Sequence, residues 1–139
     1  MKQSISMNFK GNMAFEANIN GHKIILDATE EHGGNNLGPR PKGLMLVSLG
    51  GCTGMDVVSI LKKMHVEYKS LEIVVEGNTA DEHPKKFLQM KVIYNFIGND
   101  IPFDKVQKAV DMSRDKYCGV YASLKEAMQV EHVINIQPE

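Results

Sequence analysis

The sequence predicts an α+β protein, and the order of its strand and helix patterns supports this class. Strand patterns occupy residues 4–31 and 71–96, and a long apolar helix pattern lies between them. An amphipathic helix, a short helix and a last strand follow over residues 101–137. Strands and helices grouped along the chain in this way are typical of α+β folds.

The first strand pattern, over residues 4–31, predicts a meander of two or three strands. It alternates weakly and contains Asn20-Gly21, a strong hairpin signal because both residues tolerate positive φ. Residues 32–43 then collect Gly, Asn and Pro, which predicts a loop built by turn chemistry rather than a phosphate-binding loop. Pro41 suits a first helical position, so the helix should start near it.

The central helix, from Leu44 to Met64, is apolar on nearly every side. Such a helix is buried on most of its surface, and a chain of this length needs a partner to cover it, so we predict an obligate dimer. Gly50 and Gly51 interrupt this helix at a cost of about 1 kcal/mol each relative to alanine. They predict a bare notch beside Cys52 that a substrate or a second element approaches closely.

The remaining elements follow from apolar spacing. Leu71–Glu76 and Phe87–Phe96 predict antiparallel strands, and 101–118 predicts an amphipathic helix ending near Cys118. Ser123 and Glu126 form a capping-box pattern for a short helix, and residues 130–137 alternate as a last strand.

Length and charge limit the function classes. The chain has 139 residues, with 16 Lys+Arg against 17 Asp+Glu, which fits a single domain over 1–139 and argues against a nucleic-acid partner. No signal peptide or membrane-length apolar run is evident, so we expect a cytoplasmic protein without a membrane partner. The five histidines lack ligand spacing, so neither a metal nor another cofactor is expected.

The two cysteines each allow two interpretations. In a reducing compartment a free cysteine is a small core residue or a reactive thiol. Cys52 follows the glycine notch, whereas Cys118 is predicted at a helix C-terminus, whose partial negative charge disfavours a thiolate. They lie 66 positions apart, so only the fold can bring them together.

Two segments carry a family resemblance. "GPRPKGLMLVSLGGCTGMDVVSIL" and "DKYCGVYASL" resemble the two cysteine motifs of the OsmC/Ohr family, the osmotically inducible protein C and organic hydroperoxide resistance proteins, and especially its YhfA-like branch. The resemblance covers essentially the whole chain. It implies a curved antiparallel sheet that wraps two central helices, and an intertwined homodimer with active sites at the subunit boundary.

The same resemblance implies thiol peroxidase chemistry. Cys52 matches the peroxidatic cysteine that attacks an organic hydroperoxide, and Cys118 matches the resolving cysteine that closes a disulfide. A dithiol reductant would reopen that disulfide. An oxidoreductase of this kind needs no further cofactor.

The charges around the first cysteine depart from the family pattern. Relatives stabilise the thiolate with an arginine from the N-terminal strands, held by a glutamate ten positions before the cysteine, where this chain has Lys42. Two interpretations are open. Either Arg40 or Lys42 supplies the cation that stabilises the Cys52 thiolate, with Glu16 as its partner, or both residues are solvated surface charges. Asp56 would disfavour a Cys52 thiolate if it faced the sulfur.

These departures leave a second function open. The alternative is a non-enzymatic domain of the same fold that binds a small apolar ligand at the dimer cleft. Its cysteines would then be redox sensors or core residues.

Overall fold

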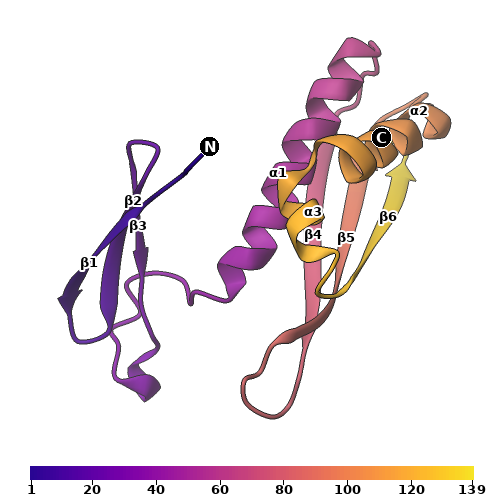
Figure 1. Ribbon diagram of the computed structural model, residues 1–139. Coiled ribbons are helices and arrows are strands. Elements are labelled where there is room, and N and C mark those ends of the chain that lie inside the picture. Colours follow the sequence, from indigo (N-terminus) through magenta and orange to yellow (C-terminus); the bar gives the residue numbers. More distant parts are fainter. The chain divides into compact units, whose positions relative to one another are not determined.

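Strands and helices follow one another nearly as the sequence predicts. The computed structural model describes residues 1–139 (Figure 1). It divides into two compact units, Met1–Met45 and Leu46–Glu139. In order, the elements are β1 (Ser6–Gly11), β2 (Ala14–Ile19), β3 (His22–Leu26), η1 (Glu30–His32), α1 (Gly43–Lys63), β4 (Ser70–Thr79), β5 (Phe87–Ile97), α2 (Phe103–Met112), η2 (Ser113–Tyr117), α3 (Gly119–Leu124) and β6 (Gln129–Gln137).

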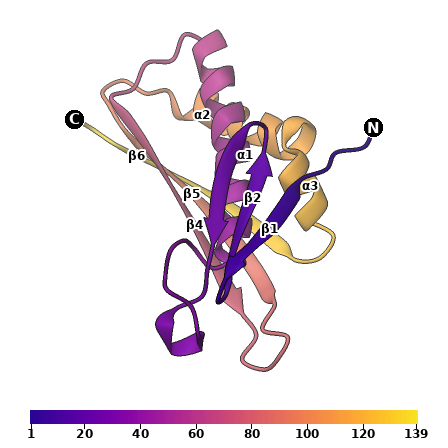
Figure 2. The ribbon, with the colours of Figure 1, turned by 90° about the vertical axis from the view of Figure 1, so that its left-hand side faces the viewer.

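The N-terminal unit is the predicted meander. Strands β1, β2 and β3 pair antiparallel in sequence order, as Figure 2 shows. Asn20 and Gly21 have φ values of 50° and 79°, which confirms the predicted hairpin turn with positive φ at both central residues. Phe9 pairs with Phe15 across β1 and β2, with ring centroids 5.4 Å apart.

The register of this meander gathers apolar side chains on one face. Met7 pairs with Ala17, and Phe15 pairs with Leu26, so side chains two apart along each strand share that face. Most of them are exposed within the single chain, which leaves an apolar sheet face without cover. Its members are Met7, Phe9, Phe15, Ala17, Ile19, Ile24 and Leu26.

The loop after β3 is organised around the buried carboxylate of Asp27. Its Oδ2 accepts hydrogen bonds from the backbone N–H groups of Asn35 and Leu37, both at 3.1 Å, and its Oδ1 accepts from Ala28 at 2.7 Å. The N–H of Leu37 is the main cause that lowers the pKa of Asp27, against burial, which raises it. The glycine-rich loop is therefore turn chemistry, as predicted.

The C-terminal unit contains a mixed sheet. Strand β4 runs antiparallel to β5, as predicted, but β6 runs parallel to β5. The prediction of a wholly antiparallel sheet is wrong at this strand because α2 and α3 carry the chain back across the sheet before β6 begins.

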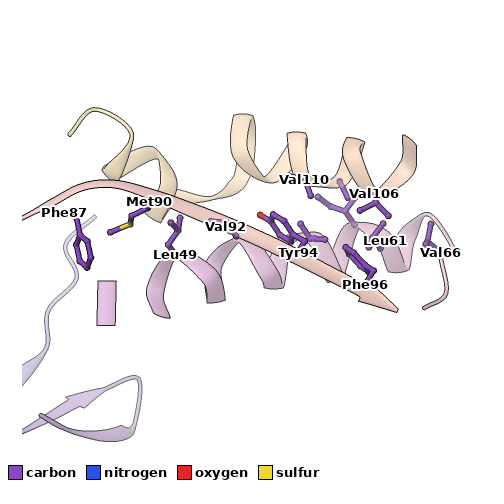
Figure 3. Close-up of a cluster of buried hydrophobic side chains, with 13 residues drawn as sticks. Leu49, Leu61, Val66, Phe87, Met90, Val92, Tyr94, Phe96, Val106 and Val110 are labelled. Carbon is purple, nitrogen blue, oxygen red and sulfur yellow. The ribbon is translucent and has the colours of Figure 1, made fainter. Parts of the chain in front are cut away.

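The core of this unit lies between the mixed sheet, α1 and α2. Along β5, Met90, Val92, Tyr94 and Phe96 alternate with more exposed residues, so one face of the strand is buried. Figure 3 shows these side chains of β5 clustered with residues of the two helices, which contribute Leu49, Val57, Ile60, Leu61, Val106, Ala109 and Val110. The long apolar pattern of α1 thus fills a core, as expected for its inner side.

The outer side of α1 is less buried than the sequence predicts. Val47 is 66% exposed and Met55 is 76% exposed within the single chain. By length and composition alone, α1 is also long and apolar enough to cross a membrane, although we expected no such segment from the sequence. Core helices of soluble proteins pass the same criterion, and α1 contributes Leu49, Val57 and Leu61 to the core.

The segment between residues 101 and 124 differs from its predicted helices. Helix α2 ends at Met112 and continues as a π-helical turn over Ser113–Tyr117. Cys118 is extended, with φ −76° and ψ 102°, and α3 starts directly after it. The capping-box prediction is wrong because Ser123 lies inside α3, where its Oγ donates to the carbonyl of Gly119 at 2.9 Å.

Candidate functional site

The fold brings the two cysteines together. Cys52 lies in α1, and Cys118 immediately precedes α3. Their Sγ atoms and a carboxylate oxygen of Asp56 all lie within 4.8 Å of one another, and both thiols are free. Two positions that are 66 residues apart in sequence therefore form one dithiol centre, which only the fold could establish.

Asp56 reaches this centre because it lies one helical turn after Cys52. Residues four apart share a helix face, so both side chains point to the same side of α1. Ser113 Oγ, at the start of the π-helical turn, donates to Asp56 Oδ2 at 2.9 Å. The carboxylate thus faces the sulfurs, and Ser113 is a site residue that the sequence analysis missed, because nothing in its local pattern marked it.

Cys118 lies at the start of a helix, whereas the sequence predicted that it lies at the end of one. Cys118 is the N-cap of α3, where its Sγ accepts a hydrogen bond from the N–H of Tyr121 at 3.3 Å. It is only 3% exposed. Burial, followed by a hydrogen bond with Cys52, raises the pKa of the Cys118 thiol to about 11, against the opposing effect of the Tyr121 N–H. Cys118 therefore stays a protonated thiol at neutral pH, although for a different reason than the predicted helix dipole.

The buried Tyr94 and the half-buried His132 lie next to the dithiol centre. The hydroxyl of Tyr94 is hydrogen-bonded to Nδ1 of His132 at 3.2 Å, and the His132 ring packs against Tyr121. Burial raises the pKa of Tyr94 to about 12, and the charges of Cys118 and Asp56 add to this effect. Burial, followed by the charge of Arg114, lowers the pKa of His132, whose Nε2 is buried without a hydrogen-bond partner. Neither residue has a sequence pattern that connects it with the cysteines.

The glycines before Cys52 have separate structural roles. A Cβ at Gly50 would lie 2.8 Å from Val75 Cγ2 on β4, whereas a Cβ at Gly51 would meet nothing within 4 Å. A Cβ at Gly54 would lie 2.6 Å from Ile73 Cδ1. Close approach of β4 thus accounts for Gly50 and also for Gly54, which the sequence analysis did not single out.

The predicted cation candidates belong to the other unit. Arg40 and Lys42, like Glu16, lie within Met1–Met45, whereas Cys52 lies within Leu46–Glu139. Arg40 lines a cleft of the N-terminal unit together with Asp27. Stabilisation of a Cys52 thiolate by Arg40 or Lys42 remains a prediction.

A cleft of about 430 Å³ has Asp56 of the dithiol centre in its lining, but neither cysteine. Its walls come from α1, α2 and the π-helical turn, and they combine apolar side chains with two lysines. The lining residues are Asp56, Ser59, Ile60, Lys63, Met64, Lys108, Met112 and Tyr117. A largely apolar molecule in this cleft can therefore contact Asp56.

The family follows from comparison with known proteins. A family model described as OsmC-like protein matches residues 33–133. The chain belongs to the OsmC-like family. This confirms the resemblance drawn from the two cysteine motifs, and both cysteines lie inside the matched residues.

Individual relatives agree with this assignment. The chain is 31% identical over 112 residues to protein YhfA of Escherichia coli K12, a match that covers 81% of each chain. A hypothetical protein from Aquifex aeolicus has a similar structure, with a TM-score of 0.86, 27% identity, and coverage of 100% of this chain and 98% of that one. An organic hydroperoxide resistance protein OsmC from Legionella pneumophila shares the fold at a TM-score of 0.69 and 12% identity, with 97% of each chain covered.

Proposed function

We propose that this OsmC-like protein is a two-cysteine peroxidase that reduces organic hydroperoxides. The observation that carries the proposal is the dithiol centre. The Sγ atoms of Cys52 and Cys118 lie within 4.8 Å of each other, so small movements of the two side chains would allow a disulfide to form. Membership of the OsmC-like family and the fold shared with an organic hydroperoxide resistance protein support the same reaction class.

In the first step the Cys52 thiolate attacks the hydroperoxide oxygen farther from carbon. A sulfur–oxygen bond forms, the oxygen–oxygen bond breaks, and an alcohol leaves after taking up a proton, so Cys52 becomes a sulfenic acid. Cys52 suits this role because it is the more accessible of the two cysteines. Cys118, buried and held as a thiol, is available to donate a hydrogen bond to the Cys52 sulfur.

In the second step Cys118 attacks the sulfenic sulfur of Cys52. The disulfide forms, the sulfur–oxygen bond breaks, and the hydroxyl leaves as water with the proton of the Cys118 thiol. Asp56 lies beside both sulfurs and is positioned to take this proton and pass it to the departing hydroxyl. A dithiol reductant then restores both thiols by disulfide exchange.

The cleft beside Asp56 supports an organic rather than a purely polar substrate. Ile60, Met64 and Met112 supply apolar surface along its walls. The alkyl part of a hydroperoxide would bind there and place its oxygen–oxygen bond at the cysteines.

We infer that the functional form is a homodimer of single-domain chains over 1–139, acting in the cytoplasm where dithiol reductants are available. The apolar face of the β1–β3 sheet and the exposed Val47 and Met55 of α1 support this assembly. Exposed apolar surface of this extent is typical of a face that a partner covers.

The alternative function is binding of a small apolar ligand without turnover. A cleft of about 820 Å³ in the N-terminal unit favours it, since Met7, Met13, Phe15 and Leu26 line the cleft. In that case the cysteines would act as a redox sensor or as packing.

Mass spectrometry of the reduced chain after stoichiometric tert-butyl hydroperoxide separates these functions. The peroxidase predicts a loss of two hydrogens per chain and a peptide pair linked through Cys52 and Cys118. If the chain stays reduced with tert-butyl hydroperoxide, and also with hydrogen peroxide and cumene hydroperoxide, the result would reject the peroxidase and favour the ligand-binding function.

A further inference from the structure

We propose that the reduced dithiol centre is also a metal site, in which Cys52, Cys118 and Asp56 bind one Zn²⁺ ion. This inference goes beyond the proposed peroxidase function and does not depend on it. Two sulfurs and a carboxylate oxygen within 4.8 Å of one another supply three ligands from two separate segments of the fold.

The spacing of the three ligand atoms is close to what tetrahedral zinc requires. With Zn–S of about 2.3 Å and Zn–O of about 2.1 Å, neighbouring ligand atoms lie about 3.6 to 3.8 Å apart. The observed upper limit of 4.8 Å exceeds this by about 1 Å, a change that rotation of the side chains can supply. Three protein ligands leave the fourth position for water.

Hydrogen bonds around the cluster already orient two of the three ligands. Ser113 Oγ holds Asp56 Oδ2 at 2.9 Å, and Ser113 is itself fully buried. The N–H of Tyr121 holds Cys118 Sγ at 3.3 Å. Partners of this kind fix the direction of ligand lone pairs, and their loss commonly weakens a metal site 10- to 100-fold.

The ligand types select the metal. Thiolates favour zinc and other soft or borderline ions, whereas Ca²⁺ and Mg²⁺ require shells made mainly of oxygen. On binding, each thiol releases its proton to solvent, and the ion occupies the sulfur lone pairs that oxidation would use. Zinc and the disulfide are therefore mutually exclusive, and bound zinc protects the cysteines from oxidation.

The direct test is titration of the reduced full-length chain with Zn²⁺ in competition with a chromophoric chelator. We expect one ion per chain and no binding after disulfide formation. Co²⁺ serves as a spectroscopic probe, and its near-ultraviolet thiolate charge-transfer band should have the intensity of two thiolates. Cys52→Ser, Cys118→Ser and Asp56→Asn should each weaken binding at least tenfold, whereas Asp111→Asn should leave it unchanged.

Two outcomes would overturn the metal site. One is a Cys52→Ser, Cys118→Ser double variant that binds zinc as tightly as the parent, since the ion would then bind elsewhere. The other is an Asp56→Asn variant with unchanged zinc affinity, since this result would show that Asp56 is not a ligand of the ion. Circular dichroism verifies that each variant is folded, and Ser113→Ala, which keeps all three ligands but removes the partner of Asp56, should weaken binding about 10- to 100-fold. A chain that binds zinc but consumes no hydroperoxide would reject the peroxidase and keep the metal site.

Discussion

Ser113 Oγ donates a hydrogen bond of 2.9 Å to Asp56 Oδ2, which joins two residues 57 positions apart. Asp56 projects from α1, and Ser113 starts the π-helical turn that leads to Cys118. Extra turns of this type are frequent at functional sites. The hydrogen bond therefore couples the helix that carries Cys52 to the segment that carries Cys118.

Removal of this hydrogen bond should destabilise the fold. Ser113→Ala leaves Asp56 Oδ2 without its partner, and we expect the free energy of unfolding to fall by about 1 to 3 kcal/mol. Urea denaturation of the reduced chain measures the change. Ser123→Ala is the matched control, because its hydroxyl is exposed and bonds only to the carbonyl of Gly119 within α3. Equal effects of the two substitutions would contradict a special role for the Ser113–Asp56 contact.

Cys118 should react slowly with alkylating agents. A pKa raised from 9.0 to about 11 lowers its thiolate fraction at neutral pH by about a hundredfold. We therefore expect iodoacetamide to modify Cys118 of the folded chain at least a hundredfold more slowly than it does in urea. Peptide mass spectrometry at timed quenches measures both rates. Comparable rates in the folded and unfolded chain would show that burial does not hold this thiol protonated.

His132 should make the protein sensitive to mild acid. Its pKa is lowered in the fold by burial, so the unfolded chain takes up the proton at higher pH than the folded chain does. Its contribution to stability is therefore full above the ordinary histidine pKa of about 6.5 and is lost as the pH falls below it.

Denaturation series between pH 7.5 and 5 test this dependence. In His132→Phe the loss of stability across that range should be smaller than in the parent, whatever the absolute stability. His22→Gln, at an exposed position, should keep the slope of the parent. A parent slope that survives His132→Phe would assign the acid sensitivity to another group.

The adjacent glycines of α1 should respond differently to alanine. Gly50→Ala places a Cβ 2.8 Å from Val75 Cγ2, and the stiff valine side chain must shift, so we expect lower stability. Gly51→Ala meets nothing within 4 Å in the single chain, so the higher helix propensity of alanine should stabilise by about 1 kcal/mol. Thermal unfolding compares the two. A destabilised Gly51→Ala variant that also dissociates in light scattering would place Gly51 at the dimer interface.

The sequence was informative where a local pattern carries the information. Asn20 and Gly21 tolerate the positive φ that the hairpin turn requires, and the alternation of apolar and polar residues along β5 predicts its buried face. The parallel pairing of β6 and the N-cap position of Cys118 were mispredicted, because both depend on how the chain crosses the sheet after α2.

The candidate site was only half visible for the same reason. Cys52 and Cys118 stand out by residue type, and Asp56 by its spacing from Cys52. Ser113, Tyr94 and His132 reach the centre through tertiary packing alone. No periodicity or motif marks such residues.

The roles of the two sulfurs should separate in single-cysteine variants. The peroxidatic thiol reacts before any disulfide exists, so Cys118→Ser should keep the first oxidation and accumulate a Cys52 sulfenic acid, which excess peroxide converts to sulfinic and sulfonic acids. Cys52→Ser should lose reaction with stoichiometric peroxide, because Cys118 is buried and its pKa is raised to about 11. Dimedone trapping followed by mass spectrometry detects the sulfenic acid in each variant. Fast oxidation in Cys52→Ser with none in Cys118→Ser would reverse the two roles, and free-thiol rates in both variants would reject the peroxidase.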